Sequence, residues 1–241
     1  MSKRLSNIVE IVSLLFVCAI AYSQAADVNT PARVVLIGDS TVCDYSAQNP
    51  ERGWGQYLQS YFDEGVKVIN LAKSGRSTKT FIKERLWKMA LDKKPDFVLI
   101  QFGHNDSHPS ERPESTNAAT DYKEYLRRYI DEARAIGAKP VLITPMVRWI
   151  FGADEILANE LQPYADAMKQ VGEEKKVPVI DLHASSRALV EPLGAAGSAD
   201  MANKPGDNTH FGEKGAMTMA ELVMKELPSA APELVIHLKK K

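Results

Sequence analysis

The 241-residue chain holds 30 lysine and arginine residues against 31 aspartate and glutamate residues, which gives a formal net charge of −1, and 44% of it is hydrophobic. Chains of this composition fold into globular domains and are too apolar to stay intrinsically disordered. A nearly neutral chain also has no strongly basic surface, so we expect no nucleic-acid partner.

Residues 1–26 have the features of a secretory signal peptide. Lys3 and Arg4 give a basic start, an apolar run follows over residues 11–21, and small residues come next at plausible cleavage positions. The run is short for a membrane span, so we expect no stable membrane anchor after signal cleavage. These features predict export, to the periplasm or out of the cell. Cleavage would leave Cys43 as the only cysteine, without an internal disulfide partner.

Residues 27–241 are expected to form one domain, because about 215 residues suit a single hydrophobic core. Five apolar runs predict buried strands, at residues 34–37, 66–71, 97–102, 141–144 and 177–182. Helical patterns occur at about 54–58, 78–91, 120–136, 154–175 and 213–227, and a loop runs from about 194 to 207. Strands that alternate with helices predict an α/β fold of three layers, α/β/α, on a flavodoxin-like five-stranded parallel sheet.

Polar residues suited to chemistry follow the first three predicted strands. The first strand ends in Gly38-Asp39-Ser40-Thr41, so a serine hydroxyl lies where the strand stops. Gly75 comes after the second strand, and Asn105 comes after the third. If the strand order is 2-1-3, as in flavodoxin-like sheets, these three ends are neighbours at the edge where such folds bind ligands.

These residues fit the roles that acyl transfer requires. The Ser40 hydroxyl needs a base to become a nucleophile, and His210 can accept its proton. Asp207, three residues before His210, can orient the imidazole ring. The backbone N–H groups of Ser40 and Gly75 and the side-chain amide of Asn105 can form an oxyanion hole.

Each of these residues also has a purely structural explanation. Gly75 can serve as a turn glycine, while Asn105 and Asp207 can satisfy loop backbone groups. Three other histidines, His104, His108 and His183, are alternatives to His210 as the base. The convergence of several motifs on one edge favours the catalytic explanation.

Three further residues are candidates for substrate binding. Arg148 and Trp149 follow the fourth strand, and Arg76 follows Gly75. An indole ring offers a flat surface for a sugar, and guanidinium groups pair with carboxylates. The alternative is that Arg148 pairs with a nearby acidic residue and that Trp149 covers the core.

The motifs resemble those of the SGNH, or GDSL, hydrolase superfamily, in which the four named residues match Ser40, Gly75, Asn105 and His210. The similarity extends to its rhamnogalacturonan acetylesterase branch, through residues 38–41, 53–56, 74–77, 101–106 and 207–211. This resemblance implies removal of acetyl groups from acetylated plant cell-wall polysaccharide or its oligosaccharides, without a metal or another cofactor. Fungal relatives carry disulfides, which the exported chain cannot form internally, so the resemblance favours a bacterial protein.

Other functions remain open from the sequence alone. An acetylesterase for xylan or another glycan, or a broad arylesterase or thioesterase, would use the same residues. A non-catalytic glycan-binding protein is expected to lack one of the motif residues, and none is missing. A nucleotide-binding flavodoxin-like protein would need a glycine-rich phosphate loop after the first strand, which this chain lacks.

Overall fold

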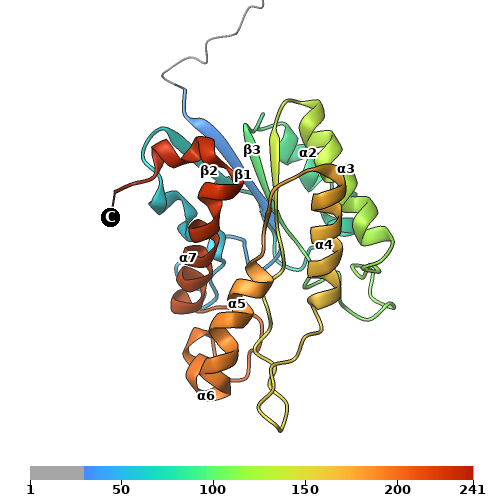
Figure 1. The fold of residues 1–241 in the computed structure, drawn as a ribbon, viewed down its shortest axis with the longest axis vertical. Coiled ribbons are helices and arrows are strands. Elements are labelled where there is room, and N and C mark those ends of the chain that lie inside the picture. Colours follow the sequence, from blue (N-terminus) through green and yellow to red (C-terminus); the bar gives the residue numbers. More distant parts are fainter. Residues whose placement is uncertain (1–29, 241) are drawn as a thin grey trace, which may run out of the picture. The chain divides into compact units, whose positions relative to one another are not determined.

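Five parallel strands form one sheet in the order β2-β1-β3-β4-β5 (Figure 1). The structure is a computed structural model that describes residues 30–240, so the predicted signal peptide at residues 1–26 lies outside the described residues. The strands are β1 (Ala32–Gly38), β2 (Val66–Asn70), β3 (Phe97–Gln101), β4 (Lys139–Ile143) and β5 (Val179–Ile180). Their order and direction confirm the predicted flavodoxin-like sheet.

The sheet is buried on both faces, which explains the continuous apolar runs of its central strands. In β1, Val34 and Leu36 belong to one hydrophobic cluster, and Val35 and Ile37 belong to a second cluster on the other face. All four side chains are inaccessible to solvent. Successive residues of a strand point to opposite faces, so one short run contributes to both cores.

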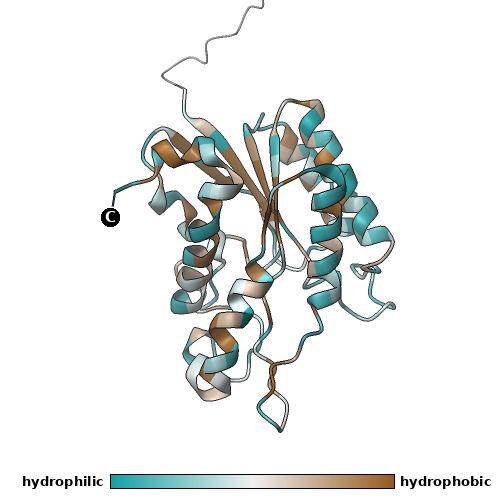
Figure 2. Cartoon of the chain, in the orientation of Figure 1, coloured by the Kyte–Doolittle hydropathy of each residue, from teal (hydrophilic) through white to brown (hydrophobic). Residues whose placement is uncertain are grey.

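Helices cover both faces of the sheet, as Figure 1 shows. One face carries η1 (Trp54–Tyr61), α5 (Leu182–Val190) and α7 (Glu213–Ala230), and the other carries α1 (Thr78–Lys83), α2 (Leu86–Leu91), α3 (Asp121–Ala135) and α4 (Gln162–Lys175). The short elements η2 (Glu191–Leu193), α6 (Gly194–Ser198), η3 (Ala199–Met201) and η4 (Pro232–His237) complete the fold. The strands are largely apolar, and the helices on both sides of the sheet carry polar as well as apolar residues (Figure 2). Helices on both faces of the sheet confirm the three-layer prediction.

Several element boundaries differ from the sequence-based prediction. The helix expected over 78–91 is two helices, because Arg85 adopts a left-handed conformation with φ of 62°. The helix expected from 154 begins at Gln162, and the preceding residues form a turn in which Phe151 and Leu157 make an antiparallel bridge. Pro163, in the first turn of α4, marks this later start.

The fifth strand is shorter than the apolar run that predicted it. Asp181 ends the run by capping α5, since its side chain accepts a hydrogen bond from the amide of Ala184 at 3.2 Å. The segment after residue 194, which was expected to be a loop, contains α6 and η3. Among residues 30–240, no helix is long and apolar enough to cross a bilayer.

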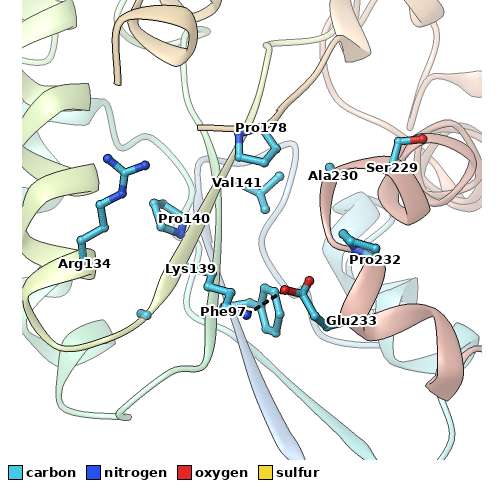
Figure 3. Close-up of a pocket in the computed structure, with 11 residues that line it drawn as sticks. Phe97, Arg134, Lys139, Pro140, Val141, Pro178, Ser229, Ala230, Pro232 and Glu233 are labelled. Atoms are coloured by element: carbon cyan, nitrogen blue, oxygen red, sulfur yellow. Dashed lines mark hydrogen bonds and ion pairs between the residues drawn. The ribbon is translucent and has the colours of Figure 1, made fainter. Parts of the chain in front are cut away.

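The amino ends of the strands lie at the edge of the sheet opposite the polar motifs. There Lys139, at the start of β4, pairs with Glu233 of η4 at 2.7 Å (Figure 3). A cavity of about 370 Å³ adjoins this pair and includes Phe97 and Pro140 in its lining. It contains none of the predicted catalytic residues, all of which follow the carboxyl ends of strands or lie in the loop before α7.

Candidate active site

Ser40, His210 and Asp207 form a continuous hydrogen-bonded chain at the carboxyl edge of the sheet. The Ser40 Oγ lies 3.1 Å from Nε2 of His210, and Nδ1 of His210 lies 3.1 Å from Oδ2 of Asp207. With a proton on Nδ1, the ring donates to Asp207 and accepts from the Ser40 hydroxyl. Ser40 is 6% exposed, while the His210 side chain is 33% exposed, so the histidine is open to solvent beside the buried serine.

Asp207 is held in place by the turn that also carries His210. Its Oδ1 accepts hydrogen bonds from the amides of Thr209 at 2.9 Å and His210 at 2.8 Å. Burial alone would raise the pKa of Asp207, but these amides and the His210 ring together hold it below the ordinary value. The carboxyl group is therefore ionised at neutral pH, as the partner of an imidazolium must be.

The loops that carry the three candidate oxyanion donors are bonded to one another. Gly75 has a φ of 79°, the left-handed conformation that glycine adopts without strain. The backbone N–H of Lys73 donates to the carbonyl of Gly38 at 3.0 Å, which ties this loop to the end of β1. The side-chain amide of Asn105 donates to the carbonyl of Arg76 at 3.0 Å. The structure thus brings the loops of Ser40, Gly75 and Asn105 together.

A buried chain of hydrogen bonds lies beneath the serine. Asp39 has no solvent exposure, and its Oδ1 accepts from the Thr41 amide at 2.9 Å and from the Thr41 hydroxyl at 2.7 Å. The same hydroxyl accepts from Gln101 at 2.7 Å, and Gln101 accepts from the Trp54 indole at 2.7 Å. These contacts join β1, β3 and η1 around the turn that presents Ser40.

His104 lies on the other side of Asp39. Its Nδ1 is 3.5 Å from Oδ2 of Asp39, and the ring is 2% exposed. Burial lowers the pKa of His104, and Asp39 only partly opposes this effect. Burial would raise the pKa of Asp39, but His104 and Thr41 lower it below the ordinary value. We therefore assign a neutral imidazole beside an ionised carboxylate.

The other two histidines considered as alternative bases, His183 and His108, have hydrogen-bond partners other than Ser40. His183 is 2% exposed, with Nδ1 3.0 Å from the Pro145 carbonyl and Nε2 3.1 Å from Oδ1 of Asn159. Its burial lowers its pKa. His108 pairs with Glu114 at 2.6 Å. Among the four histidines compared in the sequence, His210 is the one bonded to Ser40.

The three candidate substrate-binding residues all have protein partners. Arg76 pairs with Glu84 at 2.8 Å, and Arg148 lies 3.7 Å from Glu160. Trp149 is 7% exposed and packs edge-on against Phe211, with ring centroids 5.1 Å apart. The structure therefore places the indole in the core beside the site rather than on an open surface.

Glu51 is a neighbour of the site that the sequence did not indicate. It has a carboxylate oxygen within 4.8 Å of ligand atoms of Asp207 and His210, and this trio is the one such cluster of potential metal ligands in the described part of the chain. An antiparallel bridge between Arg52 and Phe211 brings it there. The two ring nitrogens of His210 already contact Asp207 and Ser40, so His210 has no free lone pair for a metal ion while these hydrogen bonds are formed.

Serine hydrolases have this arrangement, in which the serine is hydrogen-bonded to a histidine and the histidine to an aspartate. Its place at the carboxyl edge of a parallel sheet is where such folds bind ligands. The model of the GDSL-like Lipase/Acylhydrolase family matches residues 36–217, and the chain belongs to this family, the SGNH hydrolases. The resemblance read from its motifs is therefore confirmed, and the chain is an esterase of this family.

Two curated relatives are similar over most of their length. The rhamnogalacturonan acetylesterase RhgT of Bacillus subtilis is 40% identical over 223 residues, which cover 86% of this chain and 94% of the relative. A probable rhamnogalacturonan acetylesterase of the same organism, YesY, is 39% identical over 197 residues, or 80% of this chain and 90% of the relative.

Solved structures share the fold. The crystal structure of YxiM from Bacillus subtilis aligns with a TM-score of 0.73 at 29% identity, over 83% of this chain and 57% of that chain. The acetylxylan esterase Axe2 from Geobacillus stearothermophilus aligns with a TM-score of 0.64 over 84% of this chain and 96% of its own. Because Axe2 is only 22% identical, it supports the fold alone.

Asp106 fastens the loop of Asn105 to the loop of Gly75. Its buried carboxyl accepts hydrogen bonds from the Thr78 hydroxyl at 2.5 Å, the Thr78 amide at 3.1 Å and the Thr116 hydroxyl at 2.9 Å. Burial raises the pKa of Asp106 to about 7 in spite of these donors. The group therefore keeps its proton in the fold at pH values where an exposed aspartate has lost it.

This difference predicts that Asp106→Asn will change how stability depends on pH. In the unfolded chain the carboxyl releases its proton near the ordinary pKa of 3.8, whereas the folded chain holds the proton up to about pH 7. The folded state thus binds more protons between these values, so Asp106 reduces the free energy of unfolding as pH rises through this window. The asparagine variant lacks this loss, and urea unfolding at a series of pH values will measure it.

The matched control is Asp92→Asn, which removes an exposed carboxylate paired with Lys88 at 2.9 Å. Its pH dependence should follow that of the unmodified protein. The opposite outcome is that the free energies of unfolding of the unmodified protein and of Asp106→Asn differ by the same amount from about pH 4 to about pH 7. That result would show that the Asp106 carboxyl is ionised in the folded protein and would contradict the prediction.

Proposed function

We propose that the protein removes O-acetyl groups from rhamnogalacturonan through an acetyl-enzyme intermediate. The observation that carries the chemistry is the hydrogen-bonded chain from Ser40 through His210 to Asp207. The two relatives near 40% identity, one named a rhamnogalacturonan acetylesterase and the other a probable one, support the acetyl group and the polymer. Export remains a proposal that rests on the sequence of residues 1–26.

In the first half of the reaction, Ser40 Oγ attacks the acetyl carbonyl carbon while Nε2 of His210 takes the hydroxyl proton. The carbonyl oxygen becomes an oxyanion, which the N–H groups of Ser40 and Gly75 and the Asn105 amide stabilise. The intermediate collapses when the bond to the sugar oxygen breaks. His210 returns its proton to that oxygen, and the acetyl group stays on Ser40.

In the second half, water attacks the acetyl carbonyl and gives a proton to His210. Collapse of this second intermediate releases acetic acid and restores the Ser40 hydroxyl with the proton held by His210. Asp207 keeps the ring oriented and stabilises its positive charge in both halves. Every proton transfer involves atoms of this chain, the sugar or water, so the proposed mechanism requires no metal or other cofactor.

Deacetylation of a neutral polymer such as xylan is a second candidate. The sequence made Arg76 and Arg148 candidates for binding a carboxylate of the substrate, yet each lies near an acidic side chain, Glu84 at 2.8 Å or Glu160 at 3.7 Å. A guanidinium already paired with a carboxylate offers less to a substrate carboxylate. The acetylxylan esterase of Xylanibacter ruminicola is 26% identical over 220 residues.

The substrate prediction is that acetate release is faster from acetylated rhamnogalacturonan than from acetylated xylan. Initial rates should be measured on both native polymers at equal acetyl concentration, with a small neutral acetyl ester as the reference for intrinsic activity. Treatment with a chelator should leave all three rates unchanged. Faster release from xylan would assign the second candidate, and loss on chelation that a divalent ion restores would contradict the proposed mechanism.

Ser40→Ala should abolish activity on every ester, because the hydroxyl is the proposed nucleophile. Removal of a triad serine costs on the order of a million-fold in turnover. The variant should keep its circular dichroism spectrum and its thermal midpoint, since the hydroxyl contributes no contact to the core. If the folded variant kept a tenth of the activity, another nucleophile would have to be sought.

His210→Ala and His183→Ala separate catalysis from stability. The first variant should be inactive with nearly unchanged stability, because the ring is the proposed base and is partly exposed. The second should retain turnover but unfold more readily, by about 1–3 kcal/mol, because it leaves the partners Pro145 and Asn159 without their bonds. Inactivation by the His183 substitution in a folded protein would contradict the assignment.

A further inference from the structure

Arg148 makes its shortest contact with the protein backbone rather than with an acidic side chain. Its Nη2 donates to the carbonyl oxygen of His104 at 2.8 Å, and it lies 3.5 Å from the Ser107 hydroxyl. Its Nε is 3.7 Å from Glu160, which is too long for a strong hydrogen bond. The side chain is 18% exposed, so the guanidinium is largely enclosed between the loop after β3 and the segment before α4.

The bonded carbonyl belongs to the peptide unit that precedes Asn105. A peptide unit is planar and rigid, so a hydrogen bond that holds the His104 oxygen also restrains the orientation of the Asn105 N–Cα bond. The side-chain amide of Asn105 then has little freedom, since it also donates to the Arg76 carbonyl at 3.0 Å. We propose that Arg148 is a positioning residue that holds Asn105 in the oxyanion hole, rather than a contact for the polymer; this inference rests on the proposed role of Asn105.

The charge of Arg148 also suits this place. Burial lowers the pKa of His104, and the positive charge of Arg148 lowers it further against the opposing effect of Asp39. The His104 ring is therefore kept neutral close to His210, which leaves His210 as the imidazole that gains a proton during the reaction. An uncharged side chain at position 148 would lose the backbone bond, whereas burial, the largest cause of the lowered pKa, would still keep His104 neutral.

The contact between Arg148 and Glu160 contributes little to the stability of the fold. Glu160 is 37% exposed, and exposed ion pairs contribute little to stability. In contrast, a misplaced catalytic group is expensive, because a shift of about 1 Å lowers turnover about a hundred-fold. The consequence of removing Arg148 should therefore appear in kcat before it appears in the free energy of unfolding.

The experiment compares Arg148→Ala with Asn105→Ala on a small neutral acetyl ester and on acetylated rhamnogalacturonan. Loss of one oxyanion donor lowers kcat about a hundred- to a thousand-fold. We expect Arg148→Ala to lower kcat roughly ten- to a hundred-fold on both substrates, with KM changed less than about two-fold. Arg148→Lys keeps the charge and one donor, and it should recover part of the loss.

Arg187→Ala is the matched control. Arg187 also bonds backbone carbonyls, those of Leu157 at 3.3 Å and Ala158 at 3.5 Å, and it pairs with Glu191 at 2.7 Å. Its segment carries no proposed catalytic residue, so its kcat should stay within about two-fold of the unmodified enzyme. An equal loss in Arg187→Ala and Arg148→Ala would show a general structural effect and overturn the proposal.

The decisive measurement is the double variant Arg148→Ala/Asn105→Ala. If Arg148 acts through Asn105, its removal costs nothing further once Asn105 is gone, and the double variant should equal Asn105→Ala within about two-fold. Losses that multiply would overturn the proposal. So would a loss on the polymer alone through a raised KM, which would make Arg148 a substrate contact. Should Arg148→Ala fail to fold, Arg148→Lys enters the same cycle.

The two kinds of failure remain distinguishable. If the unmodified enzyme hydrolyses the small ester but not the polymer, the proposed substrate is wrong, and the cycle on the small ester still tests Arg148. If Asn105→Ala retains full turnover, Asn105 has no oxyanion role, and the positioning proposal fails with it.

Discussion

The carboxylate of Asp39 is buried without solvent exposure, one residue before the serine that the site is built around. A buried charge costs several kcal/mol unless hydrogen bonds replace its water, and here Thr41 supplies two of them. Thr41 is in turn fixed through Gln101 to Trp54. The turn after β1 therefore cannot move without leaving this charge unsatisfied, and the position of Ser40 follows from that constraint.

The parts of the fold that the sequence predicted are those set by local pattern and general topology. The run Val34–Ile37 indicates a strand buried on both faces, because the strands of a covered parallel sheet are continuous apolar runs. Parallel strands place their carboxyl ends at one edge of the sheet, so the topology alone predicts that Ser40 and Asn105 lie near each other. The three-residue spacing of Asp207 and His210 predicted that the carboxylate contacts the imidazole ring, because a single turn carries both residues.

The sequence-based predictions that were wrong concern features that depend on contacts between segments far apart in the sequence. Trp149 follows the end of a strand, as a sugar-binding residue would, yet its ring packs against Phe211 in the core. Nothing near Arg148 in the sequence identifies the His104 carbonyl as its acceptor, 44 residues away. Likewise, the apolar run over 177–182 hides the cap that starts α5, since capping depends on where the Asp181 side chain turns.

The contact between Ser40 and His210 closes a separation of 170 residues along the chain. During synthesis the serine and the loops of Gly75 and Asn105 emerge early, while the histidine emerges near the end. A growing chain therefore carries a nucleophile without a base, and its serine is as inert as any alcohol. Hydrolysis begins only when the segment before α7 docks beside β1, so the order of biosynthesis alone keeps the unfinished enzyme latent.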